Sequence, residues 1–325
     1  MTTIRFLASR LVKSIVILLC IAVLNFFLIR LAPGDPAAVM AGEAGASDEI
    51  FLQQLKEKFG LDQPLLVQLR IYMWDIVRFD LGFSYRQQMP VSQLIFERLP
   101  ATLLMTGTAF VLSILFGVVG GVLAAQKPGS WRDTGIMTAA IIFYATPLFW
   151  IALMAVLLFS VQLGWLPAFG FETVGSGYTG LQRALDIARH LVLPSMTLAL
   201  FFMAVYARMT RASMLEVASM DFVKTARAKG VPDKLIQRRH ILRNALLPVV
   251  TLAGLQAGQM IGGAVLTETV FAWPGIGRLM FDALLQRDYN LLLGVFLVSA
   301  MLVIAVNILT DIVYRMIDPR IGEGA

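Results

Sequence analysis

Long apolar runs dominate this chain, and short polar or charged stretches separate them. A bilayer core about 30 Å thick needs roughly 20 apolar residues of helix. Six runs meet that length, at residues 11–30, 101–124, 136–160, 191–209, 245–267 and 290–313. In lipid such runs must be helical, because every backbone amide has to find its partner within the segment. The pattern therefore predicts an all-α polytopic membrane protein with six transmembrane helices.

Composition agrees with a membrane solvent. Of 325 residues, 58% are hydrophobic and 15% are charged, whereas a soluble domain is nearer half apolar and a quarter charged. Arg5, Arg10 and Lys13 precede the first run, as in a signal peptide, but the apolar core is longer than a usual signal core. We expect a retained span. The single cysteine, Cys20, lies inside it, so an internal disulfide is excluded.

The charges predict the orientation of the spans. With a cytoplasmic N-terminus, the inner segments are 1–13, 125–134, 208–244 and the residues after 310. They hold 16 Lys and Arg against 7 Asp and Glu, while the outer segments hold 11 and 14. The excess of inner Lys and Arg places both termini in the cytoplasm. Topology thus accounts for the net charge of +6, and we expect no nucleic-acid partner.

The chain divides into three parts. Residues 1–31 form a tail and the first span, 32–100 form an outer loop, and 101–325 form a core of five spans with a cytoplasmic loop at 213–244. Two amphipathic stretches in the outer loop, 47–60 and 63–79, predict short helices on the outer membrane face. They either cover the bundle or dock an outside partner.

Two further outer segments join the later spans. Residues 161–190 are rich in glycine and aromatic residues and are expected to be a loop. In 271–289 a Pro-Gly turn precedes an amphipathic helix.

The fifth predicted span combines small and polar residues. Gly254, Gly258 and Gly262 recur every four residues and share one helix face, which lets another helix approach closely. Polar groups at membrane depth are costly unless they face a partner or water. Four such residues occur in or near this span: Gln256, Gln259, Thr267 and Glu268. All seven are candidates for a pathway lining or a subunit interface, with hydrogen bonding between helices as the alternative.

Sequence signatures of catalysis are absent from the chain. It has no G-x-x-x-x-G-K-[ST] phosphate loop and no H-E-x-x-H motif. No paired Cys/His spacing indicates a metal site, and no chain of charged residues within a span indicates a proton relay. We therefore expect no catalytic residue, metal or cofactor in this chain.

One compact basic block interrupts the apolar second half, DFVKTARAKGVPDKLIQRRH at 221–240. Its pattern predicts two short helices, the first closed by Gly230 and the second started at Pro232. A basic surface attracted to anionic lipid is one interpretation. The sharp corner instead favours a knob that enters a groove of another protein.

These residues carry a family resemblance. TARAKG (225–230), followed by a helix and RNALLP (243–248), resembles the EAA loop of permease subunits in binding-protein-dependent ABC importers. Stretches along the whole chain resemble one branch, the B-type permeases for dipeptides, oligopeptides and nickel. They are RLAPGDP (30–36), FGLDQPLLVQ (59–68), DLGFSY (80–85), ERLPATL (97–103), LGWLPAFG (163–170) and ETVFAWPGIGRL (268–279).

The resemblance implies a MetI-like type I permease fold in the bacterial inner membrane. It also implies a heterodimer with a second homologous permease, two ATPase subunits that hold ATP and Mg, and an outside solute-binding protein. The chain itself would be non-catalytic. The helix that couples it to the ATPases would comprise Asp221, Phe222, Val223, Lys224, Thr225, Ala226, Arg227, Ala228, Lys229 and Gly230.

The substrate stays open at this stage. Related permeases carry dipeptides, oligopeptides, glutathione, opines or nickel complexes. A self-sufficient secondary transporter would need mid-membrane ion sites or broken helices, and a membrane-embedded enzyme would need a nucleophile with a base. Neither explains the basic corner.

Overall fold

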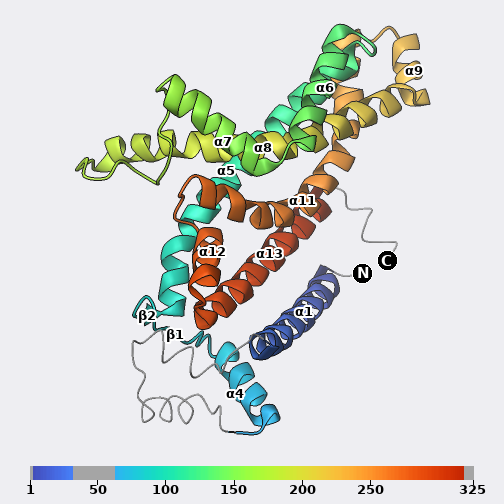
Figure 1. Ribbon diagram of the computed structural model, residues 1–325. Coiled ribbons are helices and arrows are strands. Elements are labelled where there is room, and N and C mark those ends of the chain that lie inside the picture. The colour runs from blue at the N-terminus through green and yellow to red at the C-terminus, as the bar shows by residue number, and fades with distance from the viewer. Residues whose placement is uncertain (1–2, 32–62, 318–325) are drawn as a thin grey trace. The chain divides into compact units, whose positions relative to one another are not determined.

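The computed structural model describes residues 3–31 and 63–317, and these are helical almost throughout (Figure 1). The α-helices are α1 (Thr3–Leu31), α4 (Leu65–Val77), α5 (Val91–Gln126), α6 (Trp131–Ala145), α7 (Leu148–Ala155), α8 (Gly180–Ala218), α9 (Asp221–Ala228), α10 (Asp233–Leu235), α11 (Arg243–Val270), α12 (Ile276–Gln286) and α13 (Tyr289–Ile317). Two π-helical segments are η1 (Val156–Gln162) and η2 (Ile236–Leu242). Strands β1 (Phe83–Ser84) and β2 (Met89–Pro90) pair antiparallel, with Phe83 opposite Pro90.

Five of the six predicted spans are confirmed as long apolar helices. In the described chain they cover Ser9–Leu28, Val91–Gln126, Gly180–Ala218, Asp233–Val270 and Tyr289–Ile312. Several of these helices extend beyond the apolar run, because polar residues outside the run continue the same helix. The expectation of a loop over 161–190 is accordingly wrong in its last third, where α8 has already begun at Gly180.

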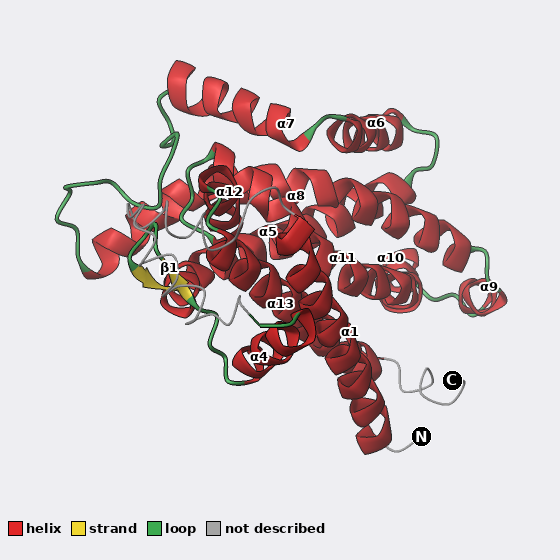
Figure 2. Cartoon of the chain, turned by 60° about the horizontal axis from the view of Figure 1, so that its bottom comes forward, coloured by secondary structure: helices red, strands yellow, loops and turns green. Residues whose placement is uncertain are grey.

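The third predicted span, 136–160, is not a straight helix. Helix α6 ends at Ala145, α7 begins at Leu148, and the two are bent by 105° (Figure 2). Pro147 lacks an N–H and drives the preceding residue out of the α region. Thr146 is extended, with φ −83° and ψ 134°. The proline therefore breaks the span, although hydropathy runs through it.

The outer-loop prediction is confirmed for its second helix. The stretch 63–79 contains α4, whereas the stretch 47–60 lies outside the described residues. The amphipathic helix expected within 271–289 is α12, which begins directly after Gly275.

The described chain forms two compact units. The first comprises the residues up to Pro100 together with Gly275–Ala305, and the second comprises Ala101–Pro274 and the residues from Val306. Helices α5 and α13 each contribute to both. Each unit has its own apolar core.

The first unit packs the start of α5 against α12 and α13. Val91, Leu94 and Ile95 share a buried cluster with Leu279 and Leu291, among others. A polar anchor joins the strand pair to the start of α13. There the Ser84 hydroxyl donates to the Asp288 carboxylate, which also accepts from the Leu291 backbone N–H. The DLGFSY motif thus supplies one half of a buried polar contact.

The second unit is built on the contact of α5, α8 and α11. Met105, Phe202, Tyr206, Val249 and Met260 lie in its core. Helices α5 and α8 come especially close at two glycines. A Cβ at Gly117 would lie 2.4 Å from Tyr206 Cβ, and one at Gly121 would lie 2.5 Å from Thr210 Cβ. This small-xxx-small pair lets the helices touch through their backbones.

An ion pair ties α6 to the far end of α8. Arg211 donates to Asp133 through Nε at 2.6 Å and Nη2 at 2.7 Å, so both carboxylate oxygens are engaged. Asp133 also accepts from the Gly129 backbone N–H. Ser130 caps α6 by accepting from the Asp133 N–H. The turn before α6 is thereby fixed to α8.

The α5–α8 contact predicts a sharp difference between neighbouring glycines. Gly121→Ala places a methyl 2.6 Å from the Ala207 carbonyl oxygen, so the helices must separate, and overpacking of this kind costs about 1–3 kcal/mol. Gly120→Ala is the matched control, because its Cβ would meet Ile136 Cγ2 at an ordinary 3.5 Å. Thermal unfolding of detergent-purified protein should show a lower Tm for the first variant and no comparable loss for the second. Equal Tm values would contradict the packing described.

Candidate functional site

The corner within the basic block is formed by α9, which follows α8 (Figure 1). Asp221 lies in the first turn of α9, where the helix dipole favours an acid. The helix ends in a Schellman motif: Gly230 N–H donates to the Arg227 carbonyl and Val231 N–H to that of Ala226. Gly230 has φ +75°, so the predicted role of this glycine in ending the helix is confirmed.

One side of α9 is anchored to the chain itself. Val223 and Ala226 are buried in a cluster with Met214 and Val217 of α8 and with Ile236 of η2. The other residues of the expected coupling segment are exposed: Asp221, Phe222, Lys224, Thr225, Arg227, Ala228, Lys229 and Gly230. The apolar residues of α9 are therefore divided, because Val223 and Ala226 face the chain itself and Phe222 is exposed.

Exposed apolar residues surround the corner. Phe222 is 42% exposed, Met220 is 41% exposed and Leu235 is 45% exposed. Two of the nearby cations have acidic neighbours within the block. Lys224 Nζ lies 2.8 Å from Asp221, and Arg227 Nε lies 3.6 Å from Asp233. The exposed surface of the corner therefore offers a partner apolar side chains as well as basic ones.

The second helix of the block is not a separate short helix. From Asp233 the chain runs through α10 and η2 into α11, giving a continuous helical segment to Val270. The segment that follows the corner is therefore the start of the fifth span. The short turn after α9 therefore leads directly into the helix of that span.

The three glycines of α11 have different surroundings. Gly254 lies against α13, since a Cβ there would be 1.9 Å from Thr310 Cγ2. Gly258 is buried. Gly262 is exposed, and a Cβ there would meet no atom within 4 Å. The structure thus shows close approach of a helix of the same chain at Gly254 and open space at Gly262.

The four polar candidates separate into two pairs. Gln256 and Gln259 line a cavity of about 290 Å³, together with Tyr144, Leu148, Phe201, Phe202, Val205 and Gly263. Thr267 and Glu268 are buried at the end of α11 instead. Only the glutamines therefore face open space.

The end of α11 is pinned to the start of the membrane part of α5. Glu268 Oε1 accepts from Thr102 Oγ1 at 2.6 Å, and Trp273 Nε1 donates to the Ala101 carbonyl at 2.8 Å. Glu268 and Trp273 are fully buried. The motifs ERLPATL and ETVFAWPGIGRL, far apart in sequence, meet here. Sequence spacing alone did not indicate that they pair.

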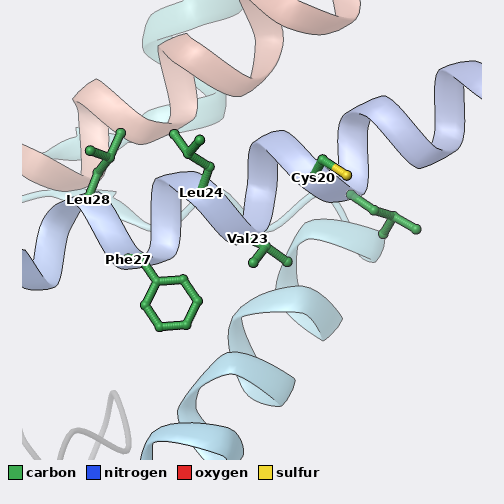
Figure 3. Close-up of a pocket in the computed structure, with 6 residues that line it drawn as sticks. Cys20, Val23, Leu24, Phe27 and Leu28 are labelled. Carbon is green, nitrogen blue, oxygen red and sulfur yellow. The ribbon is translucent and has the colours of Figure 1, made fainter.

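Helix α1 presents an apolar strip. Figure 3 shows Cys20, Val23, Leu24, Phe27 and Leu28 projecting from it. On another side of α1, the Phe26 ring lies 5.7 Å from the ring of Tyr72 on α4. Cys20 is exposed within the strip.

Within residues 3–31 and 63–317, no group of three or more His, Cys, Asp or Glu side chains could hold a metal ion. Asp133 and Glu268 are engaged in contacts that join helices, with Arg211 and Thr102, whereas Asp221 pairs with Lys224 within α9. The contacts of Asp133 and Glu268 serve packing.

Sequence comparison finds two families along the chain. Residues 117–323 match the family described as "Binding-protein-dependent transport system inner membrane component", and residues 3–106 match its N-terminal companion family. The dipeptide transport system permease protein DppB of Alkalihalophilus pseudofirmus is 40% identical over 328 residues, covering 96% of this chain and 97% of that protein. The oligopeptide transport system permease protein AppB of Bacillus subtilis is 40% identical over 318 residues, covering 97% and 98%.

A solved structure shares the fold. A chain of the MetNI methionine ABC transporter in an inward-facing conformation superposes with a TM-score of 0.55 at 19% identity, covering 70% of this chain and 97% of that chain. The predicted MetI-like permease fold is thus confirmed. The family models and the relatives agree along nearly the whole sequence, and the shared fold covers 70% of it. This chain belongs to the family of multi-pass inner-membrane components of binding-protein-dependent transport systems.

Proposed function

We propose that this chain is a permease subunit of an ATP-driven importer of dipeptides and oligopeptides. The observation that carries the proposal is the identity of about 40% over nearly the full length to permeases named for dipeptide and oligopeptide transport. The exposed corner at α9 gives the chain a surface suited to a separate ATPase. The chain itself is proposed to be non-catalytic.

The proposed assembly contains four kinds of subunit. A second homologous permease completes the pathway as a heterodimer, two ATPases bind ATP and Mg, and an outside binding protein delivers the peptide. Nucleotide and loaded binding protein need only favour one state of the permease over another, because coupling is a difference in binding free energy.

The α9 corner is proposed to enter a groove of an ATPase. The buried anchors Val223 and Ala226 hold α9 to α8 and η2. A force applied to the exposed face of α9 is therefore transmitted to α8 and α11, because α9 cannot move independently of them. Because η2 leads directly into α11, this helix is the expected path of the motion.

Both termini are proposed to lie in the cytoplasm. The distribution of Lys and Arg supports this orientation. The orientation also puts α9 on the side where ATP is available. The loop between η1 and α8 then lies outside.

A self-sufficient secondary transporter is the competing class. It would use broken helices around a mid-membrane site, and the break at Pro147 is such a feature. Family membership and the α9 corner favour the importer. Within the importer class, glutathione, an opine or a nickel complex is the alternative cargo.

Reconstitution tests the proposed function directly. The chain, co-purified with its partner permease and ATPases and placed in liposomes, should take up trialanine only when both ATP and the loaded binding protein are present. Uptake is measured with radiolabelled peptide, and omission of the binding protein is the control. Uptake driven by an ion gradient without ATP would contradict the importer class.

Substitutions on α9 test the coupling surface. Phe222→Glu should reduce uptake and binding-protein-stimulated ATP hydrolysis by about tenfold, because loss of a buried aromatic contact at an interface costs 1 kcal/mol or more. Lys224→Glu, on the same exposed face, should have a smaller effect, because Lys224 is already paired with Asp221. ATPase assays on the purified complex compare the two. A larger loss for Lys224→Glu would show that charge dominates the contact.

The orientation predicts the behaviour of reporter fusions. Green fluorescent protein fused after Ala325 should fluoresce, whereas alkaline phosphatase at the same place should be inactive. Alkaline phosphatase inserted at Gly175, between η1 and α8, should be active, since that loop is expected outside. The opposite pattern would reverse the assigned topology.

A further inference from the structure

We infer that the side-chain amides of Gln256 and Gln259 form a contact site for the peptide backbone during translocation. The inference rests on the proposed function and gives it a location. Both glutamines lie on α11 and line the cavity of about 290 Å³ described above. Ligand sites are commonly about 300–1,000 Å³, so the volume of this cavity lies at the lower end of that range and suits a short stretch of peptide backbone.

An unpartnered polar atom marks the cavity as a binding surface. Gln256 Oε1 is buried and has no hydrogen-bond partner within the described part of the chain. Buried acceptors are almost always paired. Glu268, near the end of the same helix, shows the usual arrangement, because it accepts from Thr102. The buried hydroxyls of Ser195, Tyr206 and Thr210 also lack a partner within the described residues, but Gln256 differs from them because it lines the cavity, where a ligand can reach it.

The chemistry of an amide suits a peptide backbone. A glutamine side chain carries two N–H donors and a carbonyl acceptor. A peptide group offers the complementary N–H and C=O whatever its side chains are. The contact therefore recognises what all peptides share and does not distinguish their sequences.

The cavity wall is otherwise neutral. The lining residues Tyr144, Leu148, Phe201, Phe202, Val205 and Gly263 carry no charge at neutral pH. Tyr144 and Phe201 are stacked, with ring centroids 5.5 Å apart. A neutral aromatic wall accepts apolar side chains and does not trap charged ones. A transport pathway needs this property, because binding must be weak enough for release.

The position of the cavity connects it to the coupling corner. Tyr144 is near the end of α6 and Leu148 begins α7, so the break at Pro147 lies at the cavity wall. The glutamines lie on the same continuous helical segment that starts at Asp233, beside the α9 corner. A shift of α11 driven from α9 therefore changes the cavity.

Charge substitutions at Gln256 test the contact through selectivity. In the reconstituted complex, Gln256→Glu should raise the ratio of Ala-Lys-Ala to Ala-Glu-Ala uptake about fivefold, and Gln256→Lys should lower it by a similar factor, as expected for a new charge near the cargo. Gln256→Leu should lower uptake of trialanine about tenfold. Leu255→Ala is the control, since Leu255 is 67% exposed on another side of α11. Equal losses for all peptides, with an unchanged ratio, would overturn the inference.

A second measurement keeps this inference separate from the proposed function. In a Cys20→Ala background, which contains no other cysteine, Gln256→Cys should react with the charged thiol reagent 2-(trimethylammonium)ethyl methanethiosulfonate, and Leu255→Cys should not. Trialanine delivered by the binding protein should slow the reaction at Gln256→Cys. If the wild-type complex imports none of the peptides, the proposed function fails. If it imports them but trialanine does not protect Gln256→Cys, only the backbone contact fails.

Discussion

The peptide group must find its hydrogen-bond partner inside the chain, because lipid offers none. This constraint explains why most of the described residues are helical. It also makes the exceptions informative. The chain leaves the α-helical path at Thr146–Pro147 and is π-helical at η1 and η2. Backbone that departs from the α-helix is tolerated at membrane depth where protein or a cavity surrounds it. The first break lies at the cavity lined by Gln256, and η2 joins α9 to α11.

Close packing gives these breaks a rigid frame. Hydrophobic burial does not drive helices together in lipid, so small residues and polar bonds must do so. Gly117 and Gly121 let α5 meet α8. Arg211 and Asp133 join α8 to α6, and Glu268 and Thr102 join α11 to α5. The second unit thus combines these fixed contacts with a cavity at the glutamines, where the buried Gln256 Oε1 has no hydrogen-bond partner within the described residues.

One helical segment, Asp233–Val270, thereby connects two features. The α9 corner precedes it, with its anchors buried and Phe222 exposed. Gln256 and Gln259 lie further along it, in α11. If the corner binds an ATPase and the glutamines contact the cargo, the coupling path is a helix and needs no long-range network. Under these two proposals, a movement of α9 driven by the ATPase displaces α11 and so changes the cavity that the glutamines line.

The sequence by itself determined the membrane class, five of the spans, the end of α9 at Gly230 and the family. Hydropathy and the backbone conformation of glycine are local properties, so the sequence alone predicts the spans and the end of α9. Tertiary structure decided the rest. The bend at Pro147 was missed because hydropathy continues through it. Glu268 and Gln256 look alike in sequence, as polar residues in one apolar run, yet one is paired with Thr102 and the other faces a cavity. Which of them is satisfied depends on helices distant in sequence, and only packing brings those helices together.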